Sequence, residues 1–353
     1  MNDHLEALGV TPSLFTRARG NLERDGMSPE AFTAYLLSIS HPILNRLPSM
    51  PTGKDNVTYV RSQVSLPKTM QAVINKGVKA SMANFVPAKF GITSRRALFK
   101  IPLSMLTGRL ATQAATFLME QQRSFSQSLS DDVANVLFYG GASDIPIDFE
   151  ATRGLDEYFT GPSQDVVGKR QINLSGTNVG KQTRVYMIYY GPQGGVEIQY
   201  PQMGSLGMMK SVDDTTLHSD PVNDPTAFDK YHLEYYDQAI GLCMKNPHGV
   251  ALLDNVDRED LKTGAFSARE LGKALIRMQT ALSENIQDWG PGNTTIFCSF
   301  DFLGALKLEF YDSTFGAGGR MSETNRTPMV MNFGGIDIVR EPAIGAMNRA
   351  INK

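Results

Sequence analysis

The longest periodic stretch of the chain runs from Leu110 to Phe138. Apolar residues recur in it at steps of three, four or seven, which places them on one face of an α-helix. These residues are Ala114, Leu118, Phe125, Leu129, Val133 and Val136 or Leu137. At about 1.5 Å per residue the helix is a rod of about 43 Å, and Gly140-Gly141 is a typical helix stop. The pattern predicts a long spine helix whose polar face is mostly uncharged Gln and Ser.

Other patterns predict a second helix and several strands. Ser267-Ala268-Arg269-Glu270 is a capping box, and the helix after it is expected to continue through Leu271, Leu275, Met278, Leu282 and Ile286. Runs rich in β-branched and aromatic residues predict strands. They lie at 185–190, at 196–200, between 232 and 256, and after Gly290 at TTIFCSF, LKLEFY, PMVMNF and IDIVR. Helices and strands do not alternate regularly, so we expect an α+β fold with mixed or antiparallel sheets and not a doubly wound nucleotide-binding fold.

A basic segment precedes the spine helix. Residues 55–103 combine strand-forming residues with turn breaks, which predicts an extended β-excursion with little core of its own. Between Lys54 and Lys100 nine basic residues stand against one acidic residue, a net charge of +8, which leaves 25 basic and 35 acidic residues, or −10, elsewhere. Opposite charges on one chain favour association of its copies. The candidate inter-subunit contacts are Lys54, Arg61, Lys68, Lys76, Lys79, Lys89, Arg95, Arg96 and Lys100.

The N-terminal part is helix-prone but interrupted by Gly20 and Gly26, and it ends in LNRLPSMPTG, whose prolines disfavour a regular element. This predicts an arm that leads to a boundary near residue 50.

Composition limits the class of protein. Hydrophobic residues make up 41% and charged residues 20% of the chain, which is typical of a globular protein. No run of about 18 apolar residues suggests a membrane span, and MNDHLEALGV lacks the features of a secretory signal, so folding in a cytoplasm is expected. In that compartment Cys243 and Cys298 are expected to be reduced, buried thiols.

Motifs that would carry chemistry are incomplete. Residues 176–183 resemble a phosphate-binding loop, but only three residues separate the glycines and Gln182 follows Lys181, so neither the anion nest nor the magnesium ligand is formed. The acidic stretch from Asp213 to Asp224 lacks calcium-loop spacing and contains Pro221, which favours a solvated loop. No zinc spacing or nucleophile elbow occurs. We therefore expect no enzyme activity, no cofactor and no metal.

Three segments, in order, resemble the major capsid proteins of tailed bacteriophages, and the third is made of two stretches. They are residues 44–53 with the basic excursion after them, the helix end Leu137-Phe138-Tyr139-Gly140, the turn and strand YYGPQGGVEIQYPQMGSLGM at 189–208, and YHLEYYDQAIGLCMKNPHGVALLDNVD at 231–257. The resemblance covers residues 44 to 257 well and the C-terminal third by general pattern.

The resemblance implies a Hong Kong 97-type capsid fold with four parts. These are an N-terminal arm (1–50), an extended loop (51–103), a peripheral domain (104–160 and 222–258) with its spine helix at 110–138, and an axial domain with the C-terminal strands (161–221 and 259–353). It implies pentamers and hexamers of an icosahedral shell around double-stranded DNA, assembled in the host cytoplasm. Implied partners are other copies, packaged DNA contacted non-specifically, and scaffolding, portal and decoration proteins.

Two other functions stay open from the sequence. One is an encapsulin-like compartment with the same fold that encloses cargo proteins. The other is a nucleic-acid-binding protein that uses the basic segment 54–100, in which Tyr59, Phe85, Phe90 and Phe99 alternate with cationic residues.

Overall fold

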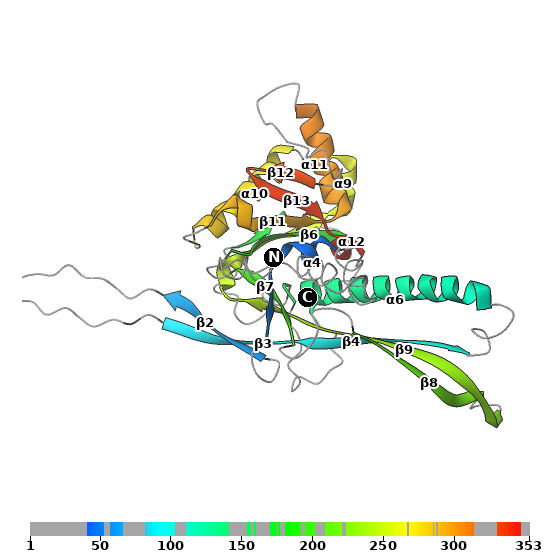
Figure 1. The fold of residues 1–353 in the computed structure, drawn as a ribbon. Helices are drawn as coiled ribbons and strands as arrows, with labels where there is room; N and C mark the ends of the chain where they lie inside the picture. Colours follow the sequence, from blue (N-terminus) through cyan, green and yellow to red (C-terminus); the bar gives the residue numbers. More distant parts are fainter. Residues whose placement is uncertain are drawn as a thin grey trace, which may run out of the picture.

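The computed structural model shows an upper lobe of helices over one sheet, and a lower layer in which a long helix lies along a second sheet (Figure 1). The structure describes residues 41–52, 57–65, 82, 84–102, 111–140, 154–156, 159, 170–174, 176, 181–191, 195–201, 209–220, 224–266, 268–284, 286, 289–313 and 330–346. Lys54, Lys68, Lys76 and Lys79, and the predicted arm up to residue 40, lie outside these ranges.

The upper lobe is built on a six-stranded mixed sheet. Its strand order is β12-β13-β11-β6-β10-β5. In that order the strands are Val330–Phe333, Ile336–Arg340, Thr294–Cys298, Gln182–Tyr189, Val250–Asp257 and Gln171–Asn173. β6 pairs antiparallel with β10 and β11, whereas β11 pairs parallel with β13. The α+β class with mixed sheets, predicted from the sequence, is therefore confirmed.

Both faces of this sheet are buried. Val185, Met187 and Tyr189 of β6 face one hydrophobic cluster, whereas Tyr186 and Ile188 face another. The first cluster also contains side chains of the helices α9 (Arg258–Thr263), α10 (Ala268–Ser283) and α11 (Phe300–Ser313). A strand buried on both faces is apolar throughout, which explains the unbroken apolar run of β6.

The strand predicted at LKLEFY is wrong, because residues 306–311 belong to the helix α11. The strand prediction followed the alternation of Leu306, Leu308 and Phe310. The helix buries Phe302, Leu303 and Leu306, whose spacing fits one helical face, and the Ser299 hydroxyl accepts a 3.4 Å hydrogen bond from the Phe302 amide at its start. Packing against α10 thus decides between two patterns that the sequence contains.

The lower sheet is organised by β9 (Asp224–Met244), a single strand of 21 residues. On one side β9 pairs with β4 (Thr93–Pro102), and on the other with β8 (Met209–Asp220) and then β7 (Val196–Tyr200). The solvated loop predicted for 213–224 is therefore wrong over 213–220. Antiparallel pairing of β8 with the first half of β9 overrides the unfavourable strand propensity of its aspartates.

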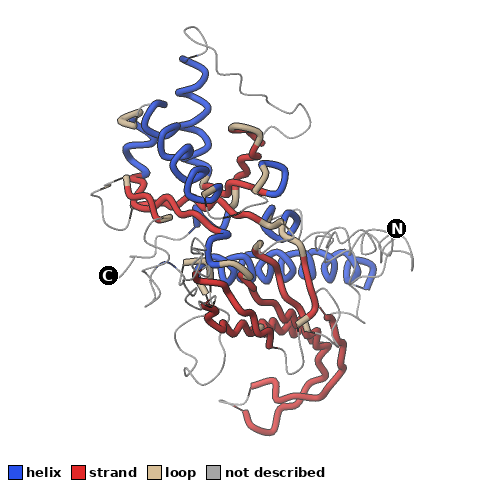
Figure 2. The backbone as a smooth tube through the Cα atoms, turned by 90° about the vertical axis from the view of Figure 1, so that its left-hand side faces the viewer, coloured by secondary structure: helices blue, strands red, loops and turns tan. Residues whose placement is uncertain are grey.

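The spine helix α6 (Ala111–Tyr139) confirms the helix predicted at 110–138. It lies along one face of the lower sheet, as Figures 1 and 2 show. Phe125 packs between Phe99 of β4 and Tyr236 of β9, with ring centroids 5.5 Å and 6.1 Å apart. The C-terminal half of the helix, with Val133 and Leu137, enters the cluster beneath the six-stranded sheet. The helix thus joins the two layers.

The prediction that the proline-rich stretch forms no regular element is wrong. Residues Pro42–Arg46 form the short helix α4, and Ser49–Pro51 form β1, which pairs parallel with β7. Pro42 stands in the first turn of α4, where a proline ring favours the helical φ and no amide hydrogen bond is lost. Ile43, Leu44 and Leu47 are fully buried. Residues 41–52 are therefore part of the subunit core.

The basic excursion divides in two. β2 (Val57–Ser65) and β3 (Asn84–Gly91) form a separate antiparallel hairpin that extends away from the body (Figure 1). The rest of the excursion, from residue 93, is β4 in the lower sheet. Phe90 is buried in the main cluster and Val60 packs against it. These two side chains hold the base of the hairpin against the body.

The two cysteines are free and buried, as predicted. Cys243 is on β9 and Cys298 ends β11. Burial raises the pKa of the Cys243 thiol to about 12, to which the nearby Glu197 carboxylate adds. The pKa of the Cys298 thiol is also raised by burial. Thiols in this state are unreactive at neutral pH.

Candidate assembly interface

The exposed surface of the β2–β3 hairpin carries an aromatic and a basic residue side by side. Tyr59 is 72% exposed, and Arg61, two residues further along β2, is also exposed. Strand alternation puts both on the same face, and the register places Lys89 of β3 directly opposite Tyr59. The other face carries Thr58 and Val60, which are partly buried. The hairpin therefore has one face toward the body and one basic, aromatic face toward solvent.

Three of the basic residues predicted from the sequence lie on β4 and have partners within the subunit. Arg96 forms a 2.7 Å ion pair with Asp237 of β9, and Arg95 lies 3.4 Å from Asp132 of α6. The Lys100 ammonium lies 3.9 Å from the centre of the Tyr231 ring. Arg96 is 78% exposed, so its pair is screened by water and contributes little stability. The positive charges of β4 therefore interact with groups of the same subunit.

The charge available for a neighbour therefore lies in the hairpin segment. Of the nine basic residues, six remain when the three of β4 are set aside, namely Lys54, Arg61, Lys68, Lys76, Lys79 and Lys89. With Asp55 as the one acidic residue, residues 54–91 carry a net charge of +5. Among the described members of this group, Arg61 has an exposed side chain.

The lower sheet has a free face opposite α6. Along β4 the side chains of Ser94, Arg96, Leu98 and Lys100 are exposed, whereas Phe99 and Ile101 face the helix. Leu98 is 50% exposed and pairs in register with Tyr235, which is 41% exposed. A sheet face with a central apolar pair bordered by charged residues is typical of an interaction surface. The sequence reasoning missed this surface, although the β4 alternation contained its signal.

An acidic hairpin, formed by β8 and β9, continues from the same sheet. The hairpin of β8 and β9 contains five aspartates between residues 213 and 229, against Lys210 and Lys230 at its ends. In Figure 2 this hairpin extends beyond the rest of the sheet. One subunit thus presents a basic hairpin at one end of the lower layer and an acidic hairpin at the other (Figure 1).

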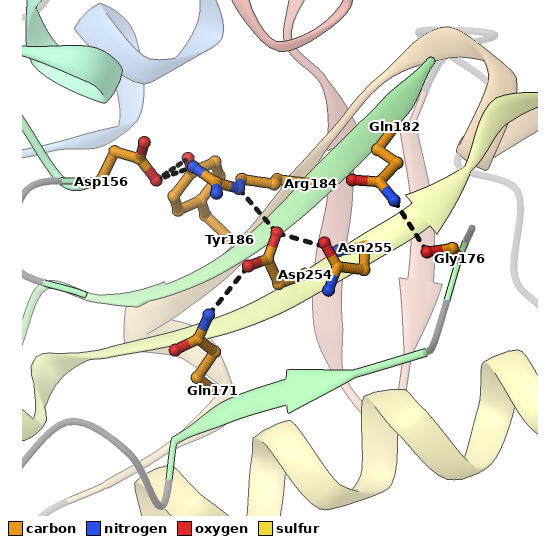
Figure 3. Close-up of polar contacts among 8 residues, drawn as sticks. All are labelled: Asp156, Gln171, Gly176, Gln182, Arg184, Tyr186, Asp254 and Asn255. Carbon is orange, nitrogen blue, oxygen red and sulfur yellow. Dashed lines mark hydrogen bonds and ion pairs between the residues drawn. The ribbon is translucent and has the colours of Figure 1, made fainter. Parts of the chain in front are cut away.

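A buried polar network lies on the six-stranded sheet (Figure 3). Arg184 of β6 donates to Asp156, and at 2.8 Å to Asp254 of β10. Gln171 donates to the other Asp254 oxygen at 2.8 Å. Burial raises the pKa of the Asp156 carboxyl although Arg184 beside it acts in the opposite direction. The network thereby joins Asp156 to the strands β5, β6 and β10 of the six-stranded sheet.

The phosphate-loop resemblance also has a structural explanation. The Gly176 amide donates to the Asn255 carbonyl at 3.0 Å, and a Cβ at Gly176 would lie 2.4 Å from that oxygen. Asn255 itself has a positive φ of 56°, at a bulge in β10. Gln182 donates to the Gly176 carbonyl at 2.8 Å. The glycine is therefore required by close backbone packing.

Among the residues that the structure describes, no group of three His, Cys, Asp or Glu side chains is arranged to hold a metal ion. Within the same residues no helix is both long enough and apolar enough to cross a membrane.

Comparison with solved structures identifies the fold. A chain of the bacteriophage epsilon15 particle matches with a TM-score of 0.59 and 14% identity over 84% of this chain and 85% of that chain. The bacteriophage JBD30 capsid has a TM-score of 0.44 and 10% identity over 87% and 90%. An encapsulin from Synechococcus elongatus has a TM-score of 0.37 and 11% identity over 60% and 85%. The first likeness confirms the predicted Hong Kong 97-like phage capsid fold.

A family match then identifies the particular kind of capsid protein. The model of the family described as major capsid protein GP7 matches residues 28–351, so the chain belongs to that family. A comparison with curated proteins finds no match. The protein is therefore a shell-forming major capsid protein of a tailed bacteriophage, which confirms the resemblance stated from the sequence and favours it over the encapsulin alternative.

Proposed function

We propose that this capsid protein assembles as pentamers and hexamers of an icosahedral shell that encloses double-stranded DNA. The observation that carries the proposal is the β2–β3 hairpin, which leaves the subunit body with an exposed Tyr59 and Arg61 on its outer face. A two-stranded hairpin of this kind is marginally stable alone and gains stability by lying on another surface. In a shell of identical subunits, that surface belongs to the next copy.

The hairpin of one copy would lie across the free face of the lower sheet of its neighbour. Leu98 and Tyr235 there are exposed and can cover Tyr59. The acidic β8–β9 hairpin continues from the same sheet and can attract the +5 charge of residues 54–91. In this arrangement Arg61 and Lys89, with Lys54, Lys68, Lys76 and Lys79 of the same segment, are the contact residues, while Arg95, Arg96 and Lys100 hold β4 in the acceptor sheet.

The four-part division expected from the sequence is retained as a proposal, with one adjustment. The arm is taken as residues before 41, since Ile43 and Leu44 belong to the core. The hairpin β2–β3 is the extended loop, α6 with β4, β8 and β9 is the peripheral domain, and the six-stranded sheet with α9, α10 and α11 is the axial domain. A scaffolding protein, a portal, a decoration protein and non-specifically held DNA are the proposed partners. Assembly takes place in the host cytoplasm.

We further propose that the protein acts without catalysis. Many copies of one modest interface give high stability once the particle closes, so no reacting group is needed. The ion pair between Arg184 and Asp254 is buried, which suits a structural role.

Negative-stain electron microscopy with light scattering, on the purified full chain between about 50 mM and 1 M salt, tests this function. Closed shells, tubes or discrete pentamers and hexamers are expected. Arg61→Glu should shift the population toward monomers, because it puts a negative charge against an acidic neighbour. Lys262→Glu, the same charge reversal at an exposed position of α9, should assemble as the parent does. If the parent chain is monomeric at every salt concentration and binds single-stranded DNA with a steep salt dependence, the nucleic-acid alternative replaces this proposal.

A further inference from the structure

A buried histidine connects three parts of the chain that are distant in sequence. His41 is 1% exposed and immediately precedes the helix α4. Its Nδ1 lies 2.5 Å from Glu341, the residue before the helix α12 (Pro342–Ala346), and its Nε2 lies 2.7 Å from Asp131 of α6. The imidazole thus lies between two carboxylates, one at each ring nitrogen.

Glu341 depends on this arrangement. It is fully buried, and its carboxylate accepts hydrogen bonds from the Ile43 amide at 3.1 Å and from the Ala343 amide at 3.4 Å, besides His41. A buried carboxylate without a compensating positive charge is strongly unfavourable. Among the ion pairs between described residues, Glu341 pairs with His41. The nearest basic residue of α4, Arg46, instead pairs with Asp337 at 2.7 Å.

We propose that His41 is a proton-operated latch, which in its charged form locks the start of α4 and the C-terminal segment 341–346 to the spine helix and which opens when alkaline conditions remove its proton. A charged imidazole donates from both nitrogens at once, which is what two facing carboxylates require. A neutral imidazole donates from one nitrogen and turns a lone pair toward the other carboxylate. The latch therefore holds in one protonation state.

The direction of the pH effect follows from the groups around the ring. Burial by itself lowers the pKa of His41, but the hydrogen bonds and charges of Glu341 and Asp131 outweigh burial and raise the pKa above its ordinary value of 6.5. The neighbouring acid on α6, Asp132, is directed to Arg95, and Asp337 of β13 to Arg46. The stabilisation by the latch is fully present below pH 6.5 and is lost as the pH rises through the raised pKa of His41.

Opening the latch leaves the fold intact and removes the contacts of His41 with Asp131 and Glu341. Ile43 and Leu44 keep α4 in the core through apolar contacts. What is released is the hold of the spine helix on residue 41 and the hold of residue 41 on the segment 341–346. Protonation of one residue can in this way set how firmly residue 41 and the segment 341–346 are fixed to the helix that joins the two lobes.

Hydrogen exchange followed by mass spectrometry on the unassembled full chain, between about pH 6 and 9, tests the latch. Rates are divided by the intrinsic rate at each pH. Protection of peptides covering 41–47 and 341–346 should fall with rising pH, by about tenfold for each unit by which the folded pKa exceeds the unfolded one. In His41→Gln, which does not titrate, protection of both segments should stay low and independent of pH. Unchanged pH dependence in this variant would overturn the proposal.

Two further variants make the result decisive. Asp131→Asn alters a half-exposed partner, so the chain should fold, and the loss of one negative charge should move the transition to lower pH. A transition that stays in place in Asp131→Asn contradicts the latch even if His41→Gln does not fold. His248→Gln is the matched control, because burial and then Arg170 lower the pKa of His248 to about 4 and this residue stays neutral over the tested range. It should keep the parental transition. Because the subunit is unassembled, the outcome is independent of the shell geometry.

Discussion

The two larger sheets of the subunit use their faces in opposite ways. In the six-stranded sheet, seven of the eight residues of β6 are buried, with alternate side chains in two separate hydrophobic clusters. In the lower sheet, β4 alternates between residues that face α6 and residues that face solvent. The first sheet is covered on both sides by its own chain. The second is covered on one side, and its other side carries the exposed pair Leu98 and Tyr235.

Under the proposed assembly, this difference separates what folds the subunit from what joins it to others. The covered sheet carries most of the apolar burial, so changes in it should alter the free energy of unfolding of a single subunit. The half-covered sheet and the β2–β3 hairpin expose apolar and basic groups at the subunit surface. Changes in them should alter assembly and leave the single subunit nearly as stable as before. Three substitutions test this separation, and they are ordered by their expected effect on subunit stability.

The largest effect is expected from Arg184→Met in the covered sheet. Methionine fills similar space but leaves the Asp156 and Asp254 carboxylates buried without their cation. We expect a loss of about 3–5 kcal/mol, as for other broken buried ion pairs. The loss should shrink at acidic pH, because protonation of Asp156, whose pKa is raised by burial, removes one of the uncompensated charges. Urea unfolding of the unassembled subunit, followed by Trp289 fluorescence, measures it.

Lys181→Met is the matched control for that substitution. Lys181 immediately precedes β6, is 65% exposed and lies 3.9 Å from Glu259. Its loss should cost less than about 1 kcal/mol, since exposed ion pairs contribute little. Equal costs at positions 181 and 184 would mean that the buried network does not stabilise the covered sheet.

An intermediate effect is expected between α6 and the covered face of the lower sheet. Leu129 of α6 is 4% exposed and lies in the small cluster formed with Phe99, Ile101 and Tyr236. Leu129→Ala should cost about 2–3 kcal/mol, the lower part of the range for buried leucines, because a small cluster can close partly around the lost side chain. The same urea unfolding measures the change. Ser128→Ala, at the exposed neighbouring position, should stay within about 0.5 kcal/mol of the parent. A cost above 4 kcal/mol at Leu129 would place the lower sheet in the folding core as well.

Sequence patterns predicted the elements that contain a long periodic run of apolar residues. The spine helix, the strand β7 and the second helix, α10, lie within a few residues of their predicted positions. Each contains a periodic run long enough to be distinguished from the alternatives. The family resemblance added the capsid fold, which periodicity alone does not provide.

Elements that depend on distant partners were predicted wrongly or missed. Residues 306–311 alternate like a strand but continue the helix α11, whose residues Phe302, Leu303 and Leu306 lie in one hydrophobic cluster with side chains of α10. Residues 213–220 look like a loop and become a strand because β9 pairs with them. His41 and Glu341 are 300 residues apart, so neither flanking sequence indicates their contact. The Leu98 and Tyr235 pair exists through the register of β4 with β9. In each case the deciding interaction is tertiary.

The smallest effect on the subunit, and the sharpest test of the separation, is expected from Tyr59→Ser on the β2–β3 hairpin. Tyr59 is 72% exposed, so its loss should change the free energy of unfolding of the unassembled subunit by less than about 0.5 kcal/mol. Assembly should nevertheless fail or require a much higher protein concentration, because a large aromatic residue at an interface is often one of the few that carry its binding energy. Urea unfolding measures the first quantity, and light scattering against protein concentration the second.

Phe300→Ser is the control, since Phe300 is also a largely exposed aromatic residue, 59%, on α11 of the other lobe, where it lies beside Arg340. It should leave the critical concentration for assembly close to that of the parent. If Tyr59→Ser assembles normally while Phe300→Ser does not, the joining surface lies on the upper lobe and the hairpin has another use. If Tyr59→Ser instead unfolds at lower urea, the exposed hairpin contributes to the fold of its own subunit. That outcome would remove the distinction between the covered sheet, which stabilises the single subunit, and the half-covered sheet with its hairpin, which is proposed to bind another copy.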